Sequence, residues 1–167
     1  MAYLGDAGQH YLFGFNAGLE YKNFYLNAFF QGVLKWMVYD GNRAFEADSW
    51  PQLSYFYHNT WEPNHMDARY PRLSTSPDIN NNNYSISDAS YMLYNNKYIR
   101  LKNIQVGYTI PSRITTRYKL NELRIYFSGT DVFEKYNLPG VFDPEKPFAH
   151  FITAFPREYS FGLNLTF

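Results

Sequence analysis

Carboxylates and histidines are the residues of this 167-residue chain that could carry out acid–base or metal chemistry. Glu46 and Asp48 lie two residues apart in the sequence, and so do Asp143 and Glu145. A glycosidase needs two carboxyl groups that face each other across a cleft, and two neighbouring loop residues do not establish that arrangement. We interpret both pairs as solvated loop charges, or as a turn at Asp143–Pro144, and we expect no catalytic residue.

The sequence also lacks the usual patterns of a metal or cofactor site. The chain has no cysteine, which excludes a disulfide framework and a cysteine-based zinc site. Its histidines are scattered, and no HExxH motif is present. No glycine-rich phosphate loop or serine nucleophile elbow is present either. We therefore expect no metal, no cofactor and no enzyme activity. The four histidines are His10, His58, His65 and His150.

Aromatic residues make up 21% of the chain, more than its 18% of charged residues. Several stand in the long stretch 35–97. Flat aromatic faces can stack on sugar rings, so this stretch supplies our candidate substrate contacts. The alternative is that these side chains pack within the loop or lie at a membrane interface, where Tyr and Trp are favoured. The candidates are Trp50, Tyr55, Tyr57 and Trp61.

Charge and hydropathy exclude two other classes. Fifteen basic residues balance fifteen acidic ones, so the net charge is zero and no basic field exists to hold a nucleic acid. No apolar run approaches the roughly 18 residues that a membrane helix needs. Strands that alternate between apolar and polar residues remain compatible with a membrane barrel, because their hydropathy signal is weak.

Period-two alternation predicts the elements that would position these residues. In the last such segment, Tyr159, Phe161, Leu163 and Leu165 share one face. The third segment changes parity between Leu101 and Ile104, which predicts a bulge or a strand break near Lys102–Asn103. A short helix is predicted at 48–60. The alternating segments, and hence the predicted strands, are 10–21, 24–34, 98–110, 122–130 and 157–167.

The connections between these strands alternate in length. Two residues join the first pair, and 111–121 joins the third and fourth strands, whereas 35–97 and 131–156 are long. In an up-and-down antiparallel sheet, alternate connections lie at opposite ends, so both long loops lie on one side. Outer-membrane barrels are built with short periplasmic turns and long extracellular loops. The pattern therefore favours an all-β chain from a large transmembrane barrel; a soluble all-β carbohydrate-binding module is the alternative.

Four stretches resemble the C-terminal part of SusC/RagA-type TonB-dependent outer-membrane transporters. The first two are YIRLKNIQVGYTIP at 98–111 and LRIYFSGTDVF at 123–133. GVFDPE at 140–145 resembles a loop of that family, and PREYSFGLNLTF at 156–167 its terminal strand. A further likeness covers the hairpin around 18–32. Residues 1–167 are thus expected to be the C-terminal barrel segment of a longer protein, since strand-like sequence begins almost directly after Met1.

The resemblance implies a location, partners and a cargo. The whole protein would import oligosaccharides or peptides across the outer membrane, with a SusD-like surface lipoprotein over its outer mouth. TonB would contact a segment upstream of this chain. The face with Tyr159, Phe161, Leu163 and Leu165 would meet outer-membrane lipid. Phe167 resembles the terminal aromatic signal read by the barrel-assembly machinery, although chance is an alternative in a chain so rich in aromatic residues.

Overall fold

The computed structural model describes residues 6–39, 58–72, 92–139, 142–147 and 155–167. The chain divides into two compact units. We call them the sheet unit (His10–Leu34, Lys97–Tyr136 and Thr153–Phe167) and the loop unit (Met1–Gln9, Lys35–Asn96 and Asn137–Ile152).

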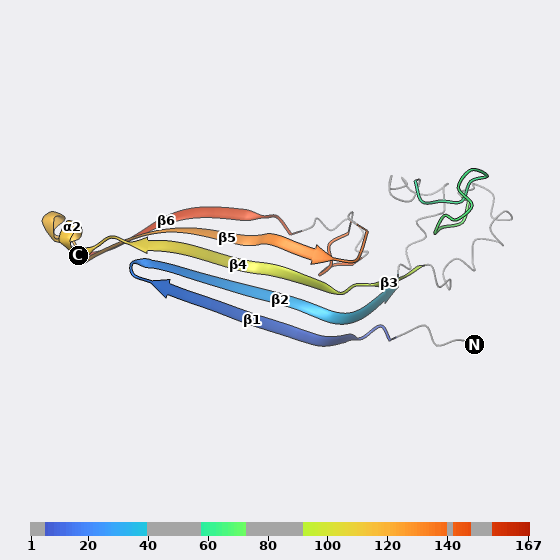
Figure 1. Ribbon diagram of the computed structural model, residues 1–167, viewed down its shortest axis with the longest axis horizontal. Helices are drawn as coiled ribbons and strands as arrows, with labels where there is room; N and C mark the ends of the chain where they lie inside the picture. Colours follow the sequence, from blue (N-terminus) through green and yellow to red (C-terminus); the bar gives the residue numbers. More distant parts are fainter. Residues whose placement is uncertain (1–5, 40–57, 73–91, 140–141, 148–154) are drawn as a thin grey trace. The chain divides into compact units, whose positions relative to one another are not determined.

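The sheet unit is an open antiparallel sheet in the order β1-β2-β4-β5-β6 (Figure 1). Each strand follows the alternation seen in the sequence, so each presents an apolar and a polar face. The strands β1 and β6 form its edges. The bounds are β1 Gln9–Tyr21, β2 Phe24–Tyr39, β4 Tyr98–Thr109, β5 Glu122–Tyr136 and β6 Glu158–Thr166.

Short connections meet at one end of this sheet. Asn23, in the turn between β1 and β2, exchanges hydrogen bonds with Thr109 at the end of β4. Asn121, before β5, donates its backbone N–H to Thr166 O at the end of β6, 2.8 Å away. The link between β4 and β5 holds helix α2 (Ser112–Thr115) and the 3-10 helix η4 (Thr116–Tyr118), which the sequence analysis did not predict. We call this end the short-connection end.

Two strands extend beyond their predicted ends. The strand β2 continues to Tyr39, because Met37–Tyr39 pairs with β3 (Leu93–Asn95) inside what was predicted to be one long loop. The strand β5 continues to Tyr136 rather than stopping at Thr130. Residues from Asp131 onward were predicted to be a loop, whereas the structure uses Asp131 as a bulge residue with φ 53°. Aspartate is among the residues that tolerate this left-handed conformation.

The predicted helix at 48–60 lies mostly outside the described residues. Of that range the structure describes 58–60, which form a turn and a β-bridge rather than a helix.

The bulge predicted near Lys102–Asn103 is confirmed, and it restores the apolar face. Lys102 has no partner in the pairing with β2, and it stands opposite Asp131 and Val132 of β5. As a result, Leu101 pairs with Phe30 and Ile104 pairs with Ala28. Phe30 and Ala28 have the same parity on β2, so Leu101 and Ile104 lie on one face despite their odd spacing.

Cross-strand rows define the two faces of the sheet. One row runs Leu26–Val106–Phe127–Phe161. A second row on the same face runs Phe24–Tyr108–Ile125–Leu163. On the opposite face a row runs Asn27–Gln105–Ser128–Ser160. The sheet therefore has one continuous apolar face and one polar face.

A row of alternating tyrosine and glycine crosses the polar face, Tyr25–Gly107–Tyr126–Gly162. A Cβ atom added at Gly107 would overlap the Tyr25 ring, and one added at Gly162 would overlap the Tyr126 ring. Each ring therefore covers the glycine of the next strand. An aromatic ring over a strand glycine shields backbone that has no side chain of its own.

We expect Gly107→Ala to destabilise the full-length protein by about 1–3 kcal/mol, because the Tyr25 ring must leave a packed position. Urea unfolding measures this cost. In Gly18→Ala, the matched control, the added Cβ would come no closer than 3.3 Å to Asn27 Oδ1. In a Tyr25→Ala background, Gly107→Ala should cost much less stability than it does in the wild type. Purely additive effects of the two substitutions would contradict the contact.

Candidate functional site

The polar face of the sheet unit carries a charged cluster near the short-connection end. Arg124 donates from Nη2 to Glu122 Oε1 over 2.9 Å, and its Nε lies 3.4 Å from Thr109 Oγ1. Its guanidinium also lies 5.1 Å from the centroid of the Tyr25 ring. The Asn27–Gln105–Ser128–Ser160 row lies on the same face. This surface offers hydrogen-bond donors and acceptors suited to water or a polar solute.

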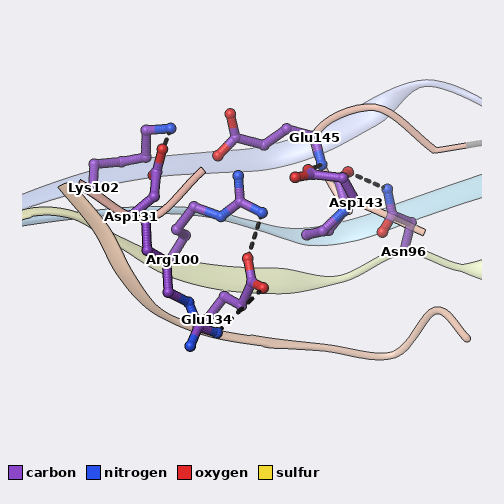
Figure 2. A network of polar contacts seen from close by, with 9 residues as sticks. Asn96, Arg100, Lys102, Asp131, Glu134, Asp143 and Glu145 are labelled. Atoms are coloured by element: carbon purple, nitrogen blue, oxygen red, sulfur yellow. Dashed lines mark hydrogen bonds and ion pairs between the residues drawn. The ribbon is translucent and has the colours of Figure 1, made fainter. Parts of the chain in front are cut away.

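A second charged cluster lies at the opposite end of the same strands (Figure 2). Arg100 on β4 donates from Nη2 to Glu134 Oε2 on β5, 2.5 Å away, and the Arg100 side chain is 1% exposed. Arg157 Nη2 lies 3.8 Å from the other oxygen of Glu134. Glu134 thus lies between two guanidinium groups that come from different segments, and it joins β4 to the start of β6.

The bulge places a further ion pair beside this cluster. Lys102 Nζ lies 2.8 Å from Asp131 Oδ1 across the bulge (Figure 2). The Phe155 ring lies 4.9 Å from Lys102 Nζ and 5.7 Å from the Arg100 guanidinium carbon. Cation–π contacts therefore hold the segment that enters β6 to Lys102 and Arg100, and Arg157 holds it to Glu134. The sequence pattern does not predict this cluster, because ion pairs between distant residues leave no local signal.

In the loop unit, Asn96 connects two segments. It donates its backbone N–H to Trp36 O and its side-chain Nδ2 to Pro144 O, each over 2.7 Å. Asp143 Oδ1 accepts the Glu145 backbone N–H over 2.8 Å, and Asp143 O accepts from Lys146. Asp143 and Glu145 therefore form a turn, one of the two interpretations given to this carboxylate pair (Figure 2). The other carboxylate pair, Glu46 and Asp48, lies outside the described residues.

We expect Asn96→Ala to loosen the turn at Asp143, because buried Pro144 O then loses its side-chain donor at a cost of about 1–3 kcal/mol. Hydrogen exchange of the Glu145 and Lys146 amides should speed up. Asn95→Ala is the matched control, since Asn95 is the neighbouring asparagine and is exposed. Unchanged exchange in Asn96→Ala would refute the connection.

Trp61, a candidate substrate contact, lies half-buried in the described segment 58–72 of the loop unit. Its backbone N–H donates to Tyr70 O over 2.9 Å. The hydroxyls of Tyr70 and Tyr94 are 2.6 Å apart, and the Arg69 guanidinium lies 4.5 Å from the Tyr94 ring centroid. The segment that carries Trp61 is thus fixed to β3. The other three candidates, Trp50, Tyr55 and Tyr57, lie outside the described residues.

The four residues singled out as lipid-facing all lie on the apolar face, at the β6 edge. Phe161, the most exposed of them at 82%, contacts the Phe127 ring with centroids 5.1 Å apart. The others are Tyr159, Leu163 and Leu165, all exposed. Phe167 follows the last strand and is exposed as well.

Among the helices of the described residues, none has the length and apolar character needed to cross a membrane. Within the same ranges, no three His, Asp or Glu side chains gather in a way that could hold a metal ion.

Comparison with known proteins shows which transport proteins the chain is similar to. TonB-dependent receptor P3 of Formosa agariphila is 30% identical over 148 residues, covering 85% of this chain and 13% of that protein. The RagAB peptide importer in its open-open state matches with a TM-score of 0.63 at 21% identity, over 93% of this chain and 17% of that one. Its closed-closed state gives a TM-score of 0.65 at 20% identity, with the same coverage. No family model matches the chain.

The matched proteins are outer-membrane transport proteins built on a β-barrel. This chain is similar to a TonB-dependent receptor over 85% of its own length. The sheet has the fold of the barrel part of RagA-like transporters, so the predicted fold class and the SusC/RagA resemblance are confirmed. The chain spans 13% of the curated relative and 17% of the solved transporter chain. The matched proteins are receptors and importers, not enzymes.

Proposed function

We propose that residues 1–167 form the C-terminal barrel segment of a TonB-dependent importer in the outer membrane. One observation carries the proposal: the antiparallel sheet exposes a continuous apolar face over several strands, opposite a polar face. A barrel wall needs both faces, one for lipid and one for the lumen. The long loops are then extracellular, and the short-connection end is periplasmic.

This arrangement gives the β6 residues their roles. Tyr159, Phe161, Leu163 and Leu165 contact outer-membrane lipid, whereas Ser160 and Asn164 face the lumen or the plug. Nothing among the described residues covers the apolar side of β6, where Phe161 is 82% exposed. In a barrel, lipid supplies that cover and neighbouring strands pair with both sheet edges.

The cargo is an oligosaccharide or a peptide, delivered with a SusD-like lipoprotein and driven by TonB through a segment upstream of this chain. The RagAB structures are those of a peptide importer, and the likeness to them supports a transporter that works with a partner protein. The aromatic residues Trp50, Tyr55, Tyr57 and Trp61 are our candidates for stacking on sugar rings. The alternative, a soluble carbohydrate-binding module, needs no apolar outer face.

Deleting the gene and measuring growth on defined sources tests the function. The strain should no longer grow when oligosaccharides, or when peptides, are its sole nutrient source. The full-length protein should fractionate with outer membranes. Trp50→Ala and Trp61→Ala should reduce growth on oligosaccharides but not on peptides if the cargo is glycan. A receptor found in the soluble fraction would instead favour the binding module.

Removal of Phe167 from the full-length protein should lower the amount of assembled barrel several-fold, because we propose that this terminal aromatic is read during assembly. Heat-modifiable mobility on gels separates folded from unfolded barrel. Phe167→Tyr keeps an aromatic end and is the matched control. Normal yield after the deletion would contradict this role.

A further inference from the structure

The link between β4 and β5 is held by backbone hydrogen bonds and by the hydroxyls of Thr115 and Thr116, which both donate to Ser112 O. Thr115 is 2% exposed, and its carbonyl accepts the Leu120 N–H over 3.1 Å. Ser112 O accepts the Thr116 hydroxyl over 2.7 Å. These bonds fold α2 and η4 into a compact helical stretch at the short-connection end, with its buried side at Thr115.

The other sides of this stretch are exposed and have a distinct chemistry. Ile114 in α2 is 52% exposed and Tyr118 in η4 is 69% exposed. Arg113, Arg117 and Lys119 are exposed as well. From Thr109 to Asn121 the sequence contains these three cations and no acidic residue.

The turn between β1 and β2 also combines an exposed cation with an aromatic ring. Asn23 is bonded to Thr109, so the turn of β1 and β2 lies beside the start of the link. Exposed Lys22 places its Nζ 5.2 Å from the centroid of the Tyr21 ring. On the apolar face, the Phe24 and Tyr108 rings lie 4.6 Å apart. Going toward this end, the surface changes from apolar to aromatic and then to cationic.

This is the polarity sequence of a membrane interface: acyl chains, then the boundary that favours Tyr, then phosphates. We propose that the α2–η4 link, together with Lys22, binds the phosphate groups of anionic phospholipids in the periplasmic leaflet. The cations Arg113, Arg117 and Lys119 contact the phosphates, and Ile114 and Tyr118 enter the acyl boundary. The proposal rests on the proposed function, which places this end at the periplasm.

The lack of any acidic residue in the link decides between lipid and a protein partner. A surface that docks one protein partner usually mixes donors and acceptors to specify it, whereas an interfacial helical segment pairs cations with Trp, Phe or Leu beside them. Each cation near an anionic membrane surface strengthens binding by about fivefold. The cations together with the exposed aliphatic and aromatic pair fit a lipid surface.

Retention of phosphatidylglycerol by the purified full-length receptor tests this site. The receptor is placed in phosphatidylcholine nanodiscs that contain a minor share of phosphatidylglycerol, and bound lipid is counted by native mass spectrometry. The test variant is Arg113→Gln/Arg117→Gln/Lys119→Asn, because asparagine tolerates the left-handed backbone of Lys119, φ 58°. Lys135→Gln removes an exposed cation at the other end of β5 and is the matched control.

The triple variant should bind phosphatidylglycerol roughly a hundredfold more weakly, about fivefold for each cation, and Lys135→Gln should bind like the wild type. Heat-modifiable mobility confirms that each barrel is folded. If the triple variant does not fold, Arg113→Gln alone should weaken phosphatidylglycerol binding about fivefold. Equal retention by wild type and variants would overturn the lipid site and favour a periplasmic protein as its occupant. Absence of the wild type from outer membranes would overturn the proposed function instead.

Discussion

Replacing Glu134 by glutamine will destabilise the folded protein by about 3–5 kcal/mol, since Arg100, 1% exposed, then loses its charge partner. Breaking a buried ion pair from one side leaves an uncompensated charge away from water. The free energy of unfolding of the full-length protein in urea measures the loss. Because Arg157 also approaches Glu134, the start of β6 should loosen in the same variant, with faster hydrogen exchange there.

Glu122→Gln is the matched control on the same strand. Glu122 pairs with Arg124 over 2.9 Å, but both side chains are at least 40% exposed. Water screens such a pair, so the expected cost is about 0–1 kcal/mol. Arg100→Met/Glu134→Leu removes both charges and should be more stable than Glu134→Gln. If the two glutamine variants were equally stable, the buried pair would have no special role.

Val106→Arg will cost about 2–4 kcal/mol of barrel stability, because it places a charge on the face proposed to meet lipid. Val106 is 39% exposed in the centre of the Leu26–Val106–Phe127–Phe161 row. In water an arginine at so exposed a position would cost little. The measurement is urea unfolding in lipid vesicles, with the amount of folded protein in outer membranes as a second readout.

Gln105→Arg places the same charge on the polar face and is the matched control. Gln105 precedes Val106 on β4 and lies in the polar row with Asn27 and Ser128. We expect Gln105→Arg to be close to wild type. If Val106→Arg and Gln105→Arg had the same effect, the sheet would not distinguish lipid from lumen, and a soluble module would fit better.

Alternation predicted where the strands lie, but it did not predict what stabilises their ends. The apolar period identified the segments of β1, β2, β4, β5 and β6, and the parity change at Leu101 located the bulge. It missed β3, because three residues leave no period and their partner Met37–Tyr39 is distant in sequence. It also placed a loop at Asp131, since the same aspartate suits a loop and a bulge.

The candidate site was predicted only in part. The turn at Asp143 was among the sequence interpretations, because an aspartate before proline favours a turn. The Arg100–Glu134 pair and the two bonds of Asn96 were missed, since both join segments far apart in the chain. A charged residue in an alternating strand looks solvated until the partner strand is known.

The lipid contact of the apolar face is the central claim, and a spin-label scan of β6 tests it most directly. This chain has no cysteine, so each introduced cysteine is the sole one within it. Labels at Phe161, Leu163 and Leu165 should collide strongly with molecular oxygen, which concentrates in lipid, and weakly with a water-soluble nickel complex. Labels at Ser160 and Asn164 should show less oxygen contact. Oxygen contact that does not alternate along β6 in native membranes would contradict the account.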